Sequence, residues 1–162
     1  MVGIFATAIP MSLINRNMFM FLIARFSFYL AFAGIRFARN RDGVATMLDW
    51  VGVGMMTISG LGMGILAVIY FTSDNSQYIV LAFFGFLALF LGWDNYRSHK
   101  NSTAIGKRRI AKHLTNMMGG TIAVTTAVLV VNVDVEPFWV WWVLPTMVIT
   151  PVIVYWKRKA LA

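Results

Sequence analysis

Long apolar runs alternate with short polar segments along the whole chain. Five of these runs are long and apolar enough, or nearly so, to cross a bilayer as helices: 17–35, 48–71, 77–95, 114–132 and 137–156. A spanning helix needs roughly 20 mostly apolar residues, and it satisfies its own backbone donors and acceptors inside lipid. Strand-like alternation is not seen. The pattern therefore predicts an all-α polytopic transmembrane bundle, with residues 1–162 forming a single domain.

The apolar segment at the start of the chain, residues 1–14, is too short to cross the membrane at about 1.5 Å per helical residue. Pro10 and the polar cluster at 15–17 separate it from the first span. A secretory signal would begin with basic residues, and this segment has none. We expect an interfacial or half-inserted segment.

The basic residues between the apolar runs test this layout, and they fall on one side of the predicted membrane. Twelve of the 14 follow the first, third and fifth spans: Arg36, Arg39, Arg41, Arg97, Lys100, Lys107, Arg108, Arg109, Lys112, Lys157, Arg158 and Lys159. The loops on the other side hold Asp74, Asp134 and Glu136 and no basic residue. Because basic loops stay in the cytoplasm, the pattern predicts a bacterial inner-membrane protein with a cytoplasmic C-terminus. The start of the first span is then periplasmic.

Composition supports a membrane protein. Hydrophobic residues make up 59% and charged residues 12% of the chain, whereas soluble domains contain about 45–50% and about 25%. The formal charge of +8 is explained by topology and by lipid headgroups, so we expect membrane lipids as partners and no nucleic acid. The absence of cysteine excludes disulfides, thiolate metal sites and a cysteine nucleophile.

Three charged residues lie within or at the edges of the spans. Arg25 is inside the first span, where a charge is costly and calls for a partner. It either contacts an anion, a quinone or another cofactor, or extends to the outer headgroups. Asp49 and Asp94 lie at the inner boundary, where an ion pair with a nearby basic residue is favoured over a proton relay.

Small residues recur on one face of two spans, which lets helix backbones approach closely. We expect helix packing at Gly60 and Gly64 in the second span, and at a stripe in the fourth span formed by Gly119, Gly120, Ala123 and Thr126. The alternatives are room for a flat cofactor or lipid tail beside the glycines, and a substrate path along the stripe.

The two histidines are poorly placed for a bis-histidine haem, because His99 is expected in a basic loop and His113 at a helix start. We therefore predict no cofactor, with haem or pigment ligation by His113 as the alternative, and we expect bound lipid. Weak candidates for cofactor contact are His113, Arg25 and Asn116. Known phosphate-loop, zinc-protease and serine-hydrolase motifs are absent, so no metal site and no catalytic residue is predicted.

The fourth and fifth spans carry the pattern HxxxMxG…TAxLVVN…PTxxxTP, from His113 to Pro151. Phe26-Ser27-Phe28-Tyr29-Leu30, Gly34-x-Arg36 and Asp49-Trp50 precede it. From about Asn17 onward the chain resembles a family of small bacterial multi-helix membrane proteins with a domain of unknown function. The resemblance implies a membrane location and a helical fold, and no particular reaction.

The sequence favours a small non-catalytic accessory or structural subunit, packed with other transmembrane subunits in a larger bacterial membrane complex, for which respiratory and photosynthetic complexes are candidates. A stand-alone cofactor-binding or redox membrane protein is the alternative. A transporter of small solutes is the third possibility.

Overall fold

The computed structural model describes residues 2–14, 17–133 and 135–162, and the described residues form helices without strands. The helices are α1 (Val2–Ile14), α2 (Met18–Arg39), α3 (Met47–Thr72), α4 (Gln77–Lys100), α5 (Gly106–Asn132) and α6 (Phe138–Leu161). Helices α2 to α6 are long and apolar enough to cross a membrane. The predicted all-α bundle with five spans is confirmed.

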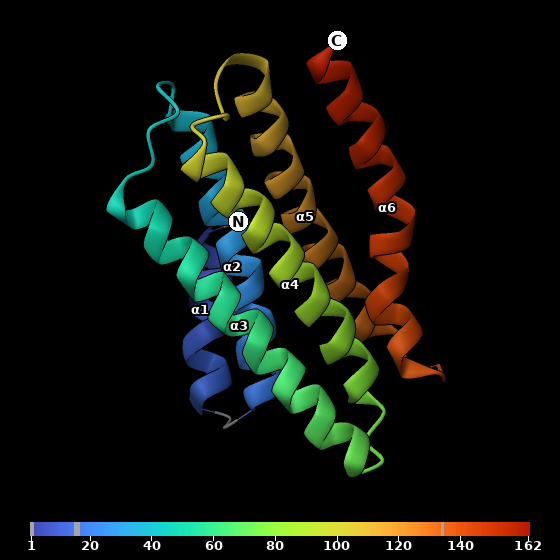
Figure 1. Ribbon diagram of the computed structural model, residues 1–162. Helices are drawn as coiled ribbons and strands as arrows, with labels where there is room; N and C mark the ends of the chain where they lie inside the picture. The colour runs from blue at the N-terminus through green and yellow to red at the C-terminus, as the bar shows by residue number, and fades with distance from the viewer. Residues whose placement is uncertain (1, 15–16, 134) are drawn as a thin grey trace.

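Helix α2 lies at the centre of the bundle. It packs against α1, α3 and α5, while α4 lies along α3, and α6 lies along α5 and touches α4 (Figure 1). Over its most apolar 18-residue window α2 is 56% buried, against 22% for α5 and α6. Its side chains therefore form a large part of the buried core.

The bundle has two chemically different ends. The "basic end" holds the ends of α2, α4 and α6 and the starts of α3 and α5, and it lies toward the top of Figure 1. The "acidic end" holds the turn between α3 and α4, with Asp74, and the segment before α6, with Glu136. Helix α1 lies along only the part of α2 near the acidic end (Figure 1). Its 13 residues extend about 20 Å, short of the roughly 30 Å hydrocarbon core.

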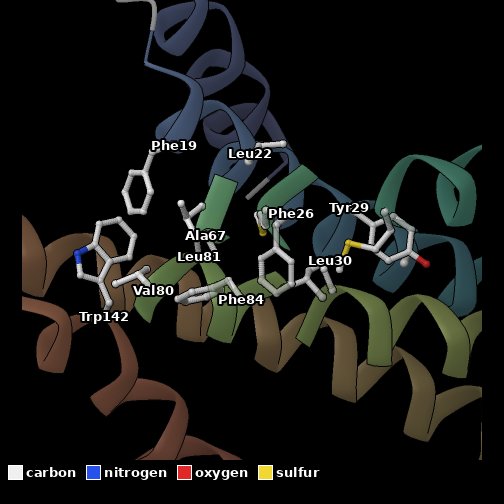
Figure 2. Close-up of a cluster of buried hydrophobic side chains, with 14 of the residues drawn as sticks. Phe19, Leu22, Phe26, Tyr29, Leu30, Ala67, Val80, Leu81, Phe84 and Trp142 are labelled. Atoms are coloured by element: carbon white, nitrogen blue, oxygen red, sulfur yellow. The ribbon is translucent and has the colours of Figure 1, made fainter. Parts of the chain in front are cut away.

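The core is aromatic and is centred on α2. Phe26 of α2 meets Phe84 of α4 edge to face at 5.5 Å, and Phe19 of α2 meets Trp142 of α6 in the same way at 5.1 Å. Figure 2 shows these rings with Leu81 between them. Edge-to-face geometry aligns the positive ring edge with the negative ring face, so these contacts fix the positions of α4 and α6 against α2.

The helices at the basic end are longer than the sequence predicted. Helix α4 continues to Lys100 and α5 begins at Gly106, so the connection is only residues 101–105 and not the whole basic segment 97–112. Hydropathy indicates only the part of a helix that lies inside the hydrocarbon core. A helix can continue beyond that part where its side chains pack against neighbouring helices. Ser98 and Ala111, in the extended parts, are both buried.

Candidate functional site

An ion pair at the basic end joins α2 to the start of α3. Arg36 Nε donates to Asp49 Oδ1 at 2.7 Å, and Arg36 Nη2 donates to Asp49 Oδ2 at 2.8 Å. Asp49 Oδ2 also accepts from the backbone N–H of Thr46 at 2.8 Å, which caps the first turn of α3. The predicted ion pair of Asp49 is confirmed. Because its carboxylate accepts hydrogen bonds from Arg36 and Thr46, Asp49 stabilises the contact between α2 and α3.

A second ion pair links α4 to α5. Lys112 Nζ donates to the carboxylate of Asp94 and, at 3.0 Å, to the backbone carbonyl of the same residue. Nearby, Arg109 donates to the carbonyl of Ala38 at the end of α2. The predicted pairing of Asp94 is also confirmed, and α5 is thereby attached to two other helices.

Between these ion pairs and the centre of the bundle lies a buried chain of hydrogen bonds. Asn95 Nδ2 donates to the hydroxyl of Tyr29 at 2.8 Å and approaches Asn116 Oδ1 at 3.5 Å. Asn116 Nδ2 donates in turn to the carbonyl of Lys112 at 2.9 Å. All three side chains are almost fully buried. Asn116, a weak candidate for cofactor contact, is thus engaged with protein groups.

His113 lies inside α5 and not at its start. Its Nδ1 lies 2.7 Å from the carbonyl oxygen of Gly34 in α2. Since a carbonyl can only accept, Nδ1 is the donor in this contact. The ring therefore helps to hold α5 against α2.

The expectation that His99 lies in a loop is wrong. His99 is in the last turn of α4, is 8% exposed, and stacks on Phe37 of α2 with ring centroids 5.0 Å apart. It is buried because α4 continues as a helix beyond the apolar run, which carries the imidazole into the space between α4 and α2.

Arg25 lies in α2 at the depth of the aromatic core. The ring of Phe21 lies 5.4 Å from its guanidinium carbon, and the side chain is half-buried. Among the described residues, no carboxylate or carbonyl oxygen pairs with it. This arginine differs from Arg36 and Arg109, which both have oxygen partners.

The glycines expected at helix contacts have different surroundings. A Cβ added to Gly60 would lie 3.0 Å from the side chain of Leu89 in α4. Gly64 is exposed on its outer side, but its backbone nitrogen would lie 3.4 Å from a Cβ on Gly85 of α4. On α5, a Cβ on Gly119 would lie 3.2 Å from Leu30, and Gly120 is buried.

The stripe on α5 contacts protein only along part of its length. Near the acidic end, Ala123 and Thr126 line a cavity of about 360 Å³ whose walls come from α1, α2, α4, α5 and α6. Ala24 and Ser27 line it from α2, and Trp142 from α6. The small side chains of α2 and α5 thus leave space here, where closer to the basic end they bring the helices together.

Sequence reasoning did not identify Tyr29, Asn95 or Trp142 as site residues. Tyr29 and Asn95 are polar groups inside or beside apolar runs, and such groups require hydrogen-bond partners when buried. That signal was present in the sequence. No such signal existed in the sequence for Trp142. Four aromatic residues lie at the start of α6, and only the packing shows that Trp142 is the buried one.

Comparison of the chain with models of known protein families, with curated proteins and with solved structures gave no match. The family resemblance stated above therefore stays a prediction from the residue pattern.

Proposed function

We propose that this multi-pass membrane protein is a small non-catalytic subunit that packs within a larger complex of the bacterial inner membrane. The observation that carries the proposal is Arg25, a guanidinium inside a spanning helix with no oxygen partner among the described residues.

The energetics of Arg25 support a partner outside the chain. An arginine at the centre of a spanning helix costs roughly 2.5–3.5 kcal/mol on insertion scales. The aromatic contact with Phe21 contributes only about 0.5–1 kcal/mol at an exposed site. A carboxylate or a set of carbonyl oxygens from a neighbouring transmembrane helix would offset the remainder.

The surroundings of Arg25 fit a docking helix. Phe21, Arg25, Phe28 and Phe32 recur at three- and four-residue spacing on α2, so they share one face. All four are only partly buried by the rest of the bundle, and Phe28 and Phe32 stack at 6.3 Å. A partner helix would cover this aromatic stripe and bring its polar group to Arg25.

The charge distribution supports the orientation, with the basic end cytoplasmic. The chain has no cysteine, so single cysteines can report it. We expect Ser102→Cys, exposed between α4 and α5, to react with a membrane-impermeant maleimide only after the inner membrane is opened. Ser73→Cys, at the acidic end, should react in intact cells whose outer membrane has been permeabilised. The reverse pattern would overturn the orientation.

Purification from the native membrane in a mild detergent tests the subunit proposal. We expect the protein to migrate as part of a larger assembly, and mass spectrometry to identify the other chains. Arg25→Leu should reduce their recovery while leaving insertion intact, and Arg25→Lys should preserve part of it. Arg108→Leu, which removes an exposed arginine from α5, is the matched control.

One result would overturn the proposal. If the protein purifies as a lone monomer and Arg25→Leu changes neither size nor stability, then a stand-alone role replaces that of a subunit.

A further inference from the structure

The cavity near the acidic end has features that helix packing does not explain. It has a volume of about 360 Å³ and opens at the bundle surface, and its lining is mostly apolar, with Met20 and Ala24 of α2 and Ala123 and Val130 of α5 among the residues. Within the described part of the chain, the lining contains no charged side chain. Pockets for small apolar ligands have this size and composition.

Two polar atoms from the cavity lining are buried without a hydrogen-bond partner among the described residues, Thr126 Oγ1 and Trp142 Nε1. Their residues are 3% and 4% exposed. Most buried polar side chains in proteins have a partner, so two unpartnered polar groups in the lining of one cavity make it a candidate ligand site.

Among the described residues of the spans, Thr126 and Thr146 have buried hydroxyls without a partner, whereas several other hydroxyls are bonded to their own helix. Ser27, Thr57, Ser59, Thr115 and Thr121 all donate to the backbone carbonyl four residues earlier. Thr126 could satisfy itself in the same way and does not, so its hydroxyl remains available to another molecule.

Trp142 restricts the chemistry of that molecule. An indole N–H can only donate, so the ligand must present an acceptor. The ring is fixed by Phe19 and Phe84, and Figure 2 shows its nitrogen turned away from the aromatic cluster. A carbonyl oxygen fits this site, because it can accept the indole hydrogen bond without placing a charge in an apolar cavity.

We propose that this cavity binds an uncharged part of an apolar membrane molecule through carbonyl oxygen, which accepts hydrogen bonds from Trp142 Nε1 and Thr126 Oγ1. Two sources share this chemistry, each with two carbonyl groups: the ring of an isoprenoid quinone and the acyl esters of a glycerolipid. The proposal is independent of the subunit role, because it concerns the isolated chain.

Calorimetric titration of the delipidated protein in detergent tests it, with two probes in separate arms. One is a benzoquinone with a decyl tail, and the other is dioctanoyl phosphatidylglycerol. Saturable binding of the first alone assigns the ring carbonyl, and of the second alone the ester carbonyl. If neither probe binds, the proposal is overturned.

Two pairs of variants show whether binding uses the proposed atoms. Thr126→Val and Trp142→Phe each remove one hydrogen bond and keep the shape, so we expect affinity to fall by about threefold to tenfold. Thr146→Val and Trp139→Phe are matched controls, since Thr146 also has a buried, unpartnered hydroxyl but neither residue lines the cavity. The controls should bind like the parent protein.

A third variant guards against misfolding. Ala127→Leu adds apolar volume at the cavity wall, so it should abolish binding while the thermal unfolding temperature stays level or rises. Binding that survives Ala127→Leu, or that weakens equally in the Thr146 and Thr126 variants, would show that the probes bind elsewhere.

Discussion

The contact between α2 and α5 differs sharply between its two halves. Toward the basic end, Gly34 lies against Met117 and Gly119 against Leu30, and Tyr29, Asn95, Asn116 and His113 are hydrogen-bonded. Toward the acidic end, small residues of the same two helices face a cavity, and two buried polar atoms have no partner. Small residues therefore do not by themselves indicate close packing. Here the small residues of the structural contact have paired polar neighbours, whereas those of the proposed binding site lie beside unpaired ones.

The largest loss of stability is expected when the charge of Arg36 loses its ion-pair partner. Asp49→Ala removes the partner of Arg36 and the cap of α3. Breaking a buried ion pair costs about 3–5 kcal/mol, and because Arg36 is partly exposed we expect roughly 2–3 kcal/mol here.

Chemical unfolding of the purified protein measures this effect. Asp42→Ala, which removes an exposed acid from the loop between α2 and α3, is the control. The double variant Arg36→Leu/Asp49→Leu should recover part of the loss. Equal stability of Asp49→Ala and the parent would show that the ion pair is not structural.

Larger side chains should have different effects on stability in the two halves of the contact between α2 and α5. A Cβ on Gly34 would lie 2.7 Å from Met117 Sδ and 3.0 Å from Met117 Cγ, so Gly34→Val should destabilise the protein by about 1–3 kcal/mol. Ala123→Leu faces the cavity and should cost clearly less. Similar losses for both variants in thermal unfolding would mean that the halves pack alike.

Removing polar groups gives the next effect. Asn95→Leu leaves the buried Tyr29 hydroxyl without its donor, which should cost about 1–3 kcal/mol. The double variant Tyr29→Phe/Asn95→Leu removes both members of the bond and should be more stable than Asn95→Leu alone. A double-mutant cycle in denaturant gives the coupling energy, and a value near zero would contradict the hydrogen bond.

The smallest effect is expected at Thr126. In the absence of ligand its hydroxyl has no partner to lose, so Thr126→Val should leave the unfolding free energy unchanged or raise it by about 1 kcal/mol. A loss as large as that of Asn95→Leu would show that Thr126 is hydrogen-bonded within the folded chain.

The spans were predictable because hydropathy reports directly on the length of chain that lipid accepts. The ion pairs of Asp49 and Asp94 were predictable as a class, since basic residues surround both. The extension of α4 was not, because it depends on where Ser98 and His99 find neighbours in three dimensions. The cavity could not be predicted for the same reason: Ala123 and Gly119 are both small residues, and only the packing shows that Gly119 lies against Leu30 while Ala123 lines the cavity.

The short connection between α4 and α5 has a mechanical consequence. Helix α4 has 24 residues and α5 has 27, or about 36 Å and about 40 Å, against a hydrocarbon core of roughly 30 Å. The helices therefore extend beyond the hydrocarbon core, and they carry Lys100, Lys107 and Arg108 on helical backbone rather than on a flexible loop. Each ammonium and guanidinium is held at a set height above the lipid tails, where anionic headgroups attract it. Tilting the bundle would move some of these charges away from the headgroups and others into the hydrocarbon, so we expect them to resist tilting and to favour an adjustment of bilayer thickness instead.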